Sequence, residues 1–442
     1  MFAEKGGMDM EKLWIADEAA AVMDALSRAG IRSWIVGGCV RDMLRGKTPH
    51  DWDIAAAAAP QEMETALSAF RLLETGIRHG TVTALVNGSP VEVTACRGEG
   101  EYRDMRHPES VTFHCSLEED LARRDFTMNA LAYRPSDGLI DLYDGVRDIE
   151  TGVIRCIRRP EDRFREDALR ILRALRFSAQ LGYRIEEETG AAIHALAGNL
   201  RVISAERCAA EFCKLILGAH AAEVLQEYGD VIAVILPVIA PMRGFYHREE
   251  HGGDLWRHSV VPLAFAPENL AVRLALVLRD CAKPVTQICG DDYPGHAERG
   301  AELVQEALRR LKLPSALIGR TAELVRFHSA LPDANRSAIL HALNVLGEET
   351  LLELIDMREA DRLSHGEDTT DIARLREKVK ELTACGACWQ LSQLAFSGDD
   401  VKARGYSGRE IGQTLQRLLD AVMDGRCENT HAALEAWLST KN

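Results

Sequence analysis

The stretch WIVGGCVRDMLRGKTPHDWDI, from Trp34 to Ile54, decides how the fold and the chemistry of this chain are interpreted. A predicted strand ends at Gly37 and Gly38, and adjacent glycines let backbone N–H groups approach a ligand closely. Asp51 and Asp53 follow, with a tryptophan between them. Because side chains alternate along a strand, the two carboxylates are expected to point the same way. The pattern favours a site for Mg²⁺ and the phosphates of a nucleoside triphosphate.

Neighbouring residues could complete this site. Arg41 and Asp42 fall on the helix predicted after the glycines and could brace it. Glu92 alternates with apolar residues in VEVT, so it is either a third acid facing the metal or an exposed strand residue. Neither GxxxxGKS nor GxxxxGKT occurs in the chain, so a P-loop is not expected. A solvated turn in which the acids only cap is the alternative.

Length and charge restrict the class of protein. A chain of 442 residues exceeds the roughly 250–300 residues that one hydrophobic core supports, so more than one domain is expected. The net charge of −15 argues against indiscriminate nucleic-acid binding. A local basic stretch from Arg155 to Arg176 holds eight arginines and four acids. If the protein binds a polyanion, we expect the contact there.

The cysteines and apolar runs predict a cytoplasmic protein. Eleven scattered cysteines are typical of reduced thiols, and Cys385 and Cys388 lack the second pair that a zinc site needs. The N-terminus has no signal-peptide pattern. The longest apolar run, Val231 to Met242, is proline-broken and far shorter than the roughly 20 residues that span a bilayer, so no membrane partner is expected.

The hydrophobic periodicity changes along the chain. It predicts a helix over Glu11–Arg28 and then short strands at residues 33–36, 51–55, 81–86, 91–95 and 139–142. After Glu161 the apolar residues recur at spacings of three and four, which predicts helices to the C-terminus. We therefore expect an α+β head and a long helical remainder, with a boundary near Ile154.

Further motifs follow the glycines and acids in a recognisable order. EEDLARRDFTMNALAY (118–133) contains an RRD motif, EDALRILRALRF (166–177) an EDxxR motif, and ISAERCAAEF (203–212) resembles a neck helix. With these segments the chain resembles the polymerase-β-type nucleotidyltransferases, specifically the bacterial tRNA nucleotidyltransferase (CCA-adding) and poly(A) polymerase family. The resemblance covers the first half of the chain and continues more loosely to the C-terminus.

The resemblance implies a domain plan. A nucleotidyltransferase head at 1–153 is followed by an all-α neck at 154–218 that binds nucleotide and tRNA. A helical body at 219–375 and a tRNA-binding tail at 376–442 complete the chain. In the head, Asp51 and Asp53 are the implied ligands of two Mg²⁺ ions and, with Glu92, the catalytic residues.

The motifs also imply a nucleotide-binding set. Its members are Gly37, Gly38, Arg41, Arg123, Arg124, Asp125, Glu166, Asp167, Arg170, Arg173 and Arg176. Arg123 and Arg124 carry planar donors suited to triphosphate oxygens, and Asp125 could hold one of them or the ribose.

The EDxxR motif suggests how a base could be selected. On a continuous helix Asp167 and Arg170 are three residues apart and therefore neighbours, beside Arg163 at the edge of a cleft. A carboxylate accepts from the exocyclic amine of cytosine or adenine, and a guanidinium donates to the adjacent acceptor. Such a pair admits CTP and ATP and refuses GTP and UTP. A plain intrahelical salt bridge is the alternative, but the family uses this motif as a protein template, with Glu166 in support.

The implied activity is addition of C, C and A to the 3′ end of the tRNA acceptor stem, from CTP and ATP. The segment Glu74–Leu85 lacks the basic patch of poly(A) polymerases of this family. Gly98–Val111 resembles the loop that CC-only members shorten. Poly(A) or CC-only addition remains the alternative within the family.

Part of the helical remainder resembles an HD-type metal-dependent phosphohydrolase. The pattern makes His258, Asp280 and Asp361 ligands, but Arg279 stands where a histidine ligand belongs. An arginine has no lone pair to give a metal, so we expect a degenerate site, and a phosphohydrolase is the rival function. A different metal site among His247, His251, His258, His296 and His328 remains open.

Overall fold

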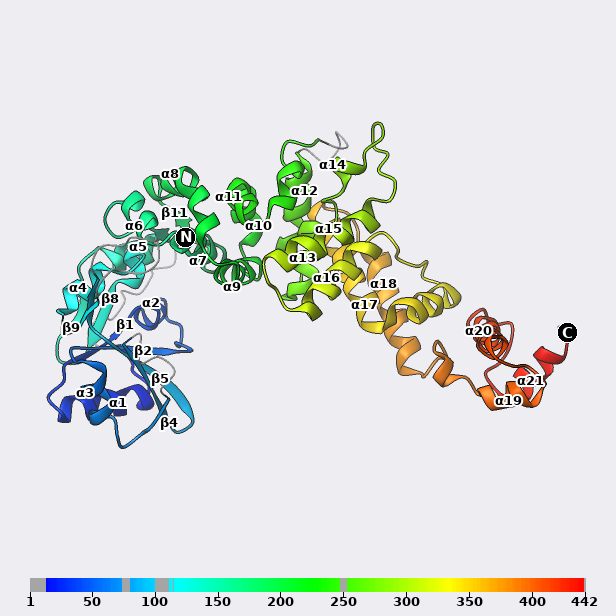
Figure 1. The fold of residues 1–442 in the computed structure, drawn as a ribbon, viewed down its shortest axis with the longest axis horizontal. Helices are drawn as coiled ribbons and strands as arrows, with labels where there is room; N and C mark the ends of the chain where they lie inside the picture. Colours follow the sequence, from blue (N-terminus) through cyan, green and yellow to red (C-terminus); the bar gives the residue numbers. More distant parts are fainter. Residues whose placement is uncertain (1–12, 74–79, 100–110, 114, 247–252, 441–442) are drawn as a thin grey trace, which may run out of the picture. The chain divides into compact units, whose positions relative to one another are not determined.

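The computed structural model describes residues 13–73, 80–99, 111–113, 115–246 and 253–440 (Figure 1). The chain divides into two compact units, residues 1–218 and 219–442, which are described separately. Of the predicted features, residues 74–79, most of the segment Gly98–Val111, and both His247 and His251 lie outside the described residues.

The first unit is built on a seven-stranded mixed sheet of order β3-β4-β5-β2-β1-β8-β9. Its strands are β1 (Ser33–Val36), β2 (Trp52–Ala56), β3 (Arg71–Leu73), β4 (Thr81–Val86), β5 (Ser89–Ala95), β8 (Leu131–Arg134) and β9 (Gly138–Asp141). All pairs are antiparallel except β2 and β5, which run parallel. Two small sheets pair β6 (Arg97–Glu99) with β7 (Val111–Phe113) and β10 (Val153–Ile154) with β11 (Arg184–Ile185).

The helices of the first unit connect and cover these strands. They are α1 (Asp17–Arg28), α2 (Gly38–Leu44), α3 (Pro60–Ala66), α4 (Leu117–Ala122), α5 (Gly145–Thr151), α6 (Pro160–Glu166), α7 (Leu169–Leu181), α8 (Glu187–Leu196) and α9 (Ala205–Ile216). The helix predicted from Glu11 begins at Asp17 in the structure, after the N-cap Ala16. The predicted neck helix is confirmed as α9.

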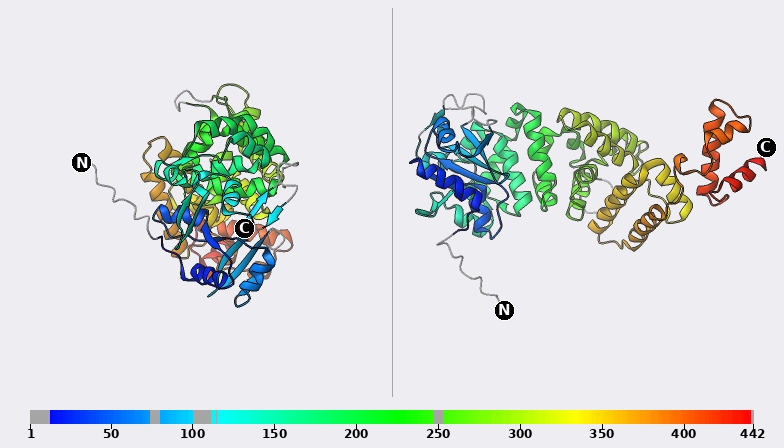
Figure 2. Two further views of the ribbon diagram at one scale, coloured as in Figure 1. Left: turned by 90° about the vertical axis from the view of Figure 1, so that its left-hand side faces the viewer. Right: turned by 90° about the horizontal axis from the view of Figure 1, so that it is seen from below.

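The second unit consists of helices in its described part. They are α10 (Ala221–Glu227), α11 (Gly229–Ile235), α12 (Leu255–Val260), α13 (Leu270–Leu278), α14 (Lys283–Thr286), α15 (His296–Arg310), α16 (Ser315–Phe327), α17 (Arg336–Ser364), α18 (Thr370–Ala384), α19 (Gly398–Ala403), α20 (Arg409–Met423) and α21 (His431–Ser439). In Figure 2 the sheet strands lie in the blue-to-cyan part of the chain, and every named element after β11 is helical. The predicted α+β head followed by a helical remainder is confirmed.

One of the three predicted domain boundaries coincides with a division of the structure, and the other two fall inside secondary-structure elements. The boundary at 218/219 coincides with the division between the compact units. The boundary at 153/154 falls inside β10, and that at 375/376 falls inside α18. One hydrophobic core joins Ile339 and Leu375 with Leu418 and Leu434, so the predicted body and tail share apolar packing. The four-part division itself stays a prediction.

No helix among the described residues is long and apolar enough to cross a membrane.

Candidate functional site

The acids singled out in the sequence converge at the middle of the head sheet. Asp53 of β2 lies directly beside Glu92 of the parallel neighbour β5, so both side chains leave the same face. Asp51 precedes the first residue of β2, whereas Trp52 is buried and packs edge-on against Trp14. The strand therefore starts one residue later than predicted, and the two aspartates still flank the buried ring.

The electrostatics show that these carboxylates crowd one another. Burial raises the pKa of Asp53, and the charges of Glu92 and Asp51 raise it further, while Arg124 lowers it. Like charges at such a site are unfavourable unless a cation offsets them. The three carboxylates thus form an all-oxygen donor set that suits a hard divalent cation.

A buried cysteine forms hydrogen bonds with the backbone of both aspartates. The thiol of Cys39 donates to the carbonyl oxygen of Asp51 at 3.0 Å, and its sulfur accepts from the backbone N–H of Asp53 at 3.1 Å. Burial raises the pKa of Cys39 to about 12, so the thiol keeps the proton that it donates. Cys39 therefore fixes the backbone that carries both acids.

The glycine pair sits against an arginine of the RRD motif. Gly37 has a φ of +75°, which favours glycine, and a Cβ there would lie 2.7 Å from Nη1 of Arg124. At Gly38 a Cβ would lie 3.6 Å from Nη2 of Arg41, a buried side chain that donates to Asn129 at 2.8 Å. The predicted glycines and arginines are thus brought together beside the acids.

Both arginines of the RRD motif are tied to one buried acid. Asp120 accepts from Arg123 at 2.6 Å and from Arg124 at 3.1 Å. Burial opposes ionisation of Asp120, but the charges of Arg124 and Arg123 outweigh it and lower its pKa. Asp120 was not predicted, although its position in α4, three and four residues before Arg123 and Arg124, was a usable signal.

Asp125 has a different partner from those predicted. It accepts from Arg173 of α7 at 2.7 Å and also from the backbone N–H of Phe126. Burial would raise the pKa of Asp125, but Arg173 outweighs it, and the pKa falls to about 2. The acid therefore joins the head to α7, and it pairs with neither Arg123 nor Arg124 in the hydrogen bonds of the described residues.

The continuous helix predicted for the EDxxR motif is wrong. Helix α6 ends at Glu166, Asp167 is extended (φ −145°, ψ 105°), and α7 starts at Leu169. The side chain of Asp167 accepts from the N–H of Leu169 at 3.0 Å, which satisfies the start of the new helix.

The break also separates the predicted base-reading pair. Asp167 accepts from Arg207 of α9 at 2.9 Å, whereas Arg170 donates to Glu166 at 2.6 Å. Arg207 lies 40 residues along the chain, so no local spacing identified it. Its only sequence signal was its place in the predicted neck helix.

Arg163 and Arg170 are buried rather than at the edge of a cleft. Arg163 donates to the carbonyl of Arg124 at 2.7 Å, and Arg170 donates to the carbonyl of Arg123 at 3.3 Å. The EDxxR segment is therefore bonded to the backbone of the RRD segment, from which the two RRD side chains extend.

Arg176 is also held inside the unit. It pairs with Glu211 at 3.2 Å and lies 4.1 Å over the ring of Phe177, which Arg41 and Arg173 also approach. Burial lowers the pKa of Arg176. Of the eight arginines between Arg155 and Arg176, only Arg158, Arg159 and Arg165 are exposed, so most of this basic stretch binds internal partners.

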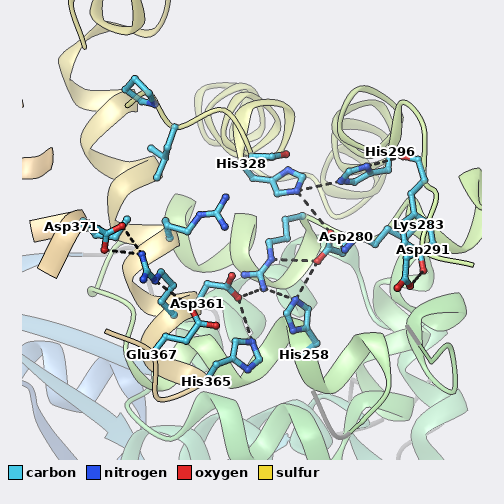
Figure 3. Close-up of a pocket in the computed structure, with 18 of the residues that line it drawn as sticks. His258, Asp280, Lys283, Asp291, His296, His328, Asp361, His365, Glu367 and Asp371 are labelled. Atoms are coloured by element: carbon cyan, nitrogen blue, oxygen red, sulfur yellow. Dashed lines mark hydrogen bonds and ion pairs between the residues drawn. The ribbon is translucent and has the colours of Figure 1, made fainter. Parts of the chain in front are cut away.

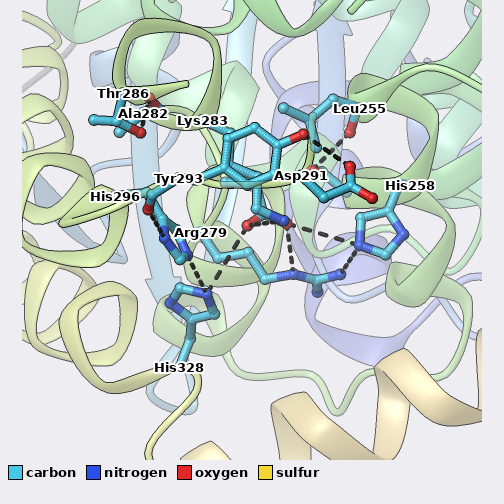
Figure 4. A network of polar contacts seen from close by, with 12 residues as sticks. Leu255, His258, Arg279, Ala282, Lys283, Thr286, Asp291, Tyr293, His296 and His328 are labelled. Carbon is cyan, nitrogen blue, oxygen red and sulfur yellow. Dashed lines mark hydrogen bonds and ion pairs between the residues drawn. The ribbon is translucent and has the colours of Figure 1, made fainter. Parts of the chain in front are cut away.

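The HD-like residues His258, Asp280 and Asp361 line a pocket of 860 Å³ in the second unit (Figure 3), and Arg279 lines it as well (Figure 4). One guanidinium nitrogen donates to Asp361 at 2.6 Å and lies 3.0 Å from Nε2 of His258. The same guanidinium lies 3.4 Å from Asp280. Arg279 thus occupies the position between the predicted ligands.

Family models match most of the chain. The poly A polymerase head domain matches residues 33–155, and a model described as "Probable RNA and SrmB- binding site of polymerase A" matches residues 182–242. The tRNA nucleotidyltransferase domain 2 model matches residues 298–438.

One curated relative aligns with nearly the whole chain, and another aligns with about half of it. The CCA-adding enzyme of Lactobacillus delbrueckii subsp. bulgaricus is 33% identical over 423 residues, covering 96% of this chain and 97% of that protein. This chain belongs to the CCA-adding enzyme family. The family member from Leuconostoc mesenteroides is 49% identical over 209 residues, which are 47% of this chain and 52% of that protein.

A solved structure confirms the fold of this family member. The Bacillus stearothermophilus CCA-adding enzyme in complex with CTP matches with a TM-score of 0.73 and 29% identity. The match covers 96% of this chain and 97% of the other. The chain is therefore an enzyme of the tRNA nucleotidyltransferase class, with the predicted head and helical remainder.

Proposed function

We propose that this chain adds C, C and A to the 3′ end of tRNA from CTP and ATP, without a nucleic-acid template. The observation that carries the proposal is the convergence of Asp51, Asp53 and Glu92 beside Arg124 and Gly37. The relatives named as CCA-adding enzymes support it, and so does the similarity to a family member whose structure contains CTP.

Asp51 and Asp53 would hold two Mg²⁺ ions, with Glu92 as a third carboxylate. The all-oxygen donor set and the raised pKa of Asp53 fit a divalent cation at this place. When bound, Mg²⁺ would lower the pKa of the tRNA 3′-hydroxyl and offset the charge of the leaving pyrophosphate. Cys39 keeps the two aspartates in register for this task.

The triphosphate would lie along Gly37, Gly38 and the RRD arginines. Nε of Arg124 is buried without a hydrogen-bond partner among the described residues, so it is a donor available to a phosphate oxygen. Arg124 lies against Gly37, and its charge reaches Asp53. One guanidinium therefore lies against Gly37 and acts electrostatically on Asp53, and it would contact the phosphates of a bound nucleotide.

Asp167 would accept from the exocyclic amine of cytosine or adenine, and Arg170 would donate to the neighbouring acceptor. In the structure these side chains bind Arg207 and Glu166 instead, so each must exchange a partner when a base arrives. Asp167 lies at the break between α6 and α7 and Arg170 lies in the first turn of α7, which supports a common recognition site.

The exposed arginines Arg158, Arg159 and Arg165 would contact phosphates of the tRNA acceptor stem. The tRNA-binding role of residues 376–442 and the cytoplasmic location stay predictions.

The test uses purified protein, Mg²⁺ and a tRNA transcript that ends at the discriminator base. Products formed with CTP, ATP or both are sized at single-nucleotide resolution. Growth by three nucleotides with CTP plus ATP supports the proposal. A stop after two nucleotides indicates CC-only addition, a long A-tail indicates a poly(A) polymerase, and no extension refutes nucleotidyl transfer.

The rival phosphohydrolase activity has little support in the second unit. The cation of Arg279 contacts His258 and Asp361, so it would repel a metal ion placed between them. Hydrolysis of a 2′,3′-cyclic nucleotide to its 2′- or 3′-monophosphate would revive this rival.

A further inference from the structure

Asn129 lies between two groups of the residues proposed to bind the nucleotide, and the sequence did not single it out. It is the last residue of the 3₁₀ turn η2 (Thr127–Asn129) after the RRD motif, and it is buried. Its side-chain oxygen accepts from Nη1 of Arg41 at 2.8 Å, and its amide nitrogen donates to Oδ1 of Asp125 at 3.3 Å. Arg41 belongs to α2, whereas Asp125 accepts from Arg173 of α7 at 2.7 Å. One amide therefore joins the glycine side of the site to the base-reading helix.

The two partners of Asn129 require an amide at this position. A guanidinium only donates, so the atom that faces Arg41 must be the amide oxygen. Burial would raise the pKa of Asp125, but Arg173 outweighs it and lowers the pKa to about 2, so this carboxylate is ionised and only accepts. The atom that faces Asp125 must therefore be the NH₂ group. A carboxylate in place of the amide would set two acceptors against each other, and an apolar side chain would satisfy neither partner.

This chain of hydrogen bonds holds two like charges close together. The guanidinium groups of Arg41 and Arg173 lie 5.4 and 5.5 Å from the centre of the Phe177 ring. Because like charges repel, their positions must be fixed by acceptors between them, which Asp125 and Asn129 supply. A shift of Arg173 would therefore be transmitted through both acceptors to Arg41.

The backbone of Asn129 reaches the RRD arginine as well. Its carbonyl oxygen accepts from Nη1 of Arg124 at 3.5 Å and would lie 3.9 Å from a Cβ at Gly37. We propose that Asn129 is a positioning residue that fixes Arg41 relative to Arg173, so that both guanidinium groups meet one bound nucleotide in a single arrangement. The inference rests on the proposed nucleotidyl transfer and adds a residue that acts on the nucleotide through these arginines.

The experiment measures CTP addition by the full-length protein to a tRNA transcript that ends at the discriminator base. Asn129→Asp keeps an acceptor for Arg41 but sets a second carboxylate against Asp125. The KM for CTP should rise about 10-fold, whereas kcat and the KM for tRNA should stay within about 2-fold of the wild type. An unchanged KM for CTP would overturn the proposal, and so would an equal rise in the KM for tRNA.

Two further variants separate positioning from folding. Asn129→Ser adds no charge, and its short hydroxyl cannot reach both partners, so the KM for CTP should rise about 5-fold. Asn87→Asp adds the same charge in the exposed turn between β4 and β5, where φ is +52°, and it should leave every constant unchanged. Circular dichroism checks folding. If neither Asn129 variant folds, Asn129 serves the stability of the turn and the proposal is wrong.

A double-mutant cycle tests whether Asn129 acts through Arg41. Arg41→Gln alone should raise the KM for CTP. In that background Asn129→Ser should raise it by less than about 2-fold more, because the contact between the two side chains is already lost. Effects that multiply would mean that the two residues act independently, and they would overturn the proposal.

Binding of CTP without tRNA distinguishes a failure of this inference from a failure of the proposed function. Titration calorimetry with CTP and Mg²⁺ should give a Kd about 10-fold higher for Asn129→Asp than for the wild type. If the wild type binds CTP but does not extend tRNA, the proposed function is wrong, and the two Kd values still test Asn129. If the wild type extends tRNA and the Kd values are equal, the inference about Asn129 alone is wrong.

Discussion

Two groups of acidic side chains, one in each compact unit, differ in the charges that surround them. In the head, Asp53 lies beside Glu92 and Asp51, and burial together with these like charges raises its pKa. In the helical unit, burial opposes ionisation of Asp361, but Arg279 outweighs it and lowers the pKa. Arg124 offsets the first group only in part, because the pKa of Asp53 stays raised, whereas Arg279 bonds directly to Asp361 in the second.

This difference in local charge indicates which acidic group can bind a metal ion. Crowded carboxylates gain most from a hard cation such as Mg²⁺, which matches the role proposed for the head. Where a guanidinium already neutralises an acid, as Arg279 does beside Asp361, the carboxylate gains little from a further cation. A single arginine in place of a histidine thus separates the two kinds of site.

The largest expected effect comes from removing the head acids. Asp51→Asn/Asp53→Asn should reduce kcat for tRNA extension by about 10³-fold, because the metal's stabilisation of several kcal/mol is lost. The matched control Asp137→Asn changes an exposed acid that pairs with Arg32 and should extend tRNA normally. Retained activity in the double variant would show that the head acids are not catalytic. The proposed contrast between the two acidic groups would then be wrong.

The base-reading residue should give the next largest effect. Asp167→Asn should reduce kcat/KM for CTP and ATP by about 100-fold and weaken the discrimination against UTP and GTP, since a good bidentate contact contributes about 1–3 kcal/mol. Arg207→Gln, which removes the present partner of Asp167, tests whether that partner matters as much. Single-nucleotide kinetics with all four triphosphates decide this, and unchanged selectivity in Asp167→Asn would refute base reading by this carboxylate.

Replacing Arg279 should allow the group of His258 and Asp361 to bind a metal ion, as the head acids are proposed to do. Arg279→His removes the guanidinium between His258 and Asp361 and supplies a lone pair instead. The Zn²⁺ content should rise by about one equivalent relative to the wild type, measured by mass spectrometry after both proteins are incubated with Zn²⁺ and desalted. An unchanged Zn²⁺ content would show that Arg279 is not what keeps a metal ion out of this group.

Removing one acid from each group should change the free energy of unfolding in opposite directions. The folded pKa of Asp53 is raised, so its contribution falls as pH rises through that pKa, and Asp53→Asn should stabilise the metal-free protein at pH 7 by about 1 kcal/mol. The folded pKa of Asp361 is lowered, so its stabilisation is present above the unfolded pKa and is lost as pH falls through the folded pKa. Asp361→Asn should therefore destabilise at pH 7 by about 2 kcal/mol.

Denaturant unfolding at pH 7 and at pH 4, without added metal, measures both changes. The difference between the two variants should shrink at the lower pH. Shifts of the same sign at pH 7 would contradict the contrast in local charge.

The smallest effect is expected at Cys39. Cys39→Ala removes the bonds to Asp51 and Asp53, so kcat should fall about 5-fold with KM nearly unchanged, and stability should fall by about 1 kcal/mol. Cys385→Ser, at an exposed cysteine, is the control. A change in KM alone would assign Cys39 to nucleotide binding rather than to positioning the acids.

The sequence by itself predicted the features that depend on local pattern. Strand alternation placed Asp53 and Glu92 as candidates for one face, and the structure puts them side by side in β2 and β5. The change of periodicity separated the strand-containing head from the helical remainder. Arg279 already indicated that the HD-like group had lost a ligand, because its side chain chemistry does not depend on the fold.

Only the tertiary structure decided which polar groups are partners. Asp167 pairs with Arg207 and Asp125 with Arg173, which lie 40 and 48 residues apart along the chain. Helical spacing relates only residues three or four apart, so it favoured the neighbour Arg170 and a continuous helix. Burying a charge requires a partner wherever packing supplies one, and that packing broke the helix at Asp167 and brought His296 to His328.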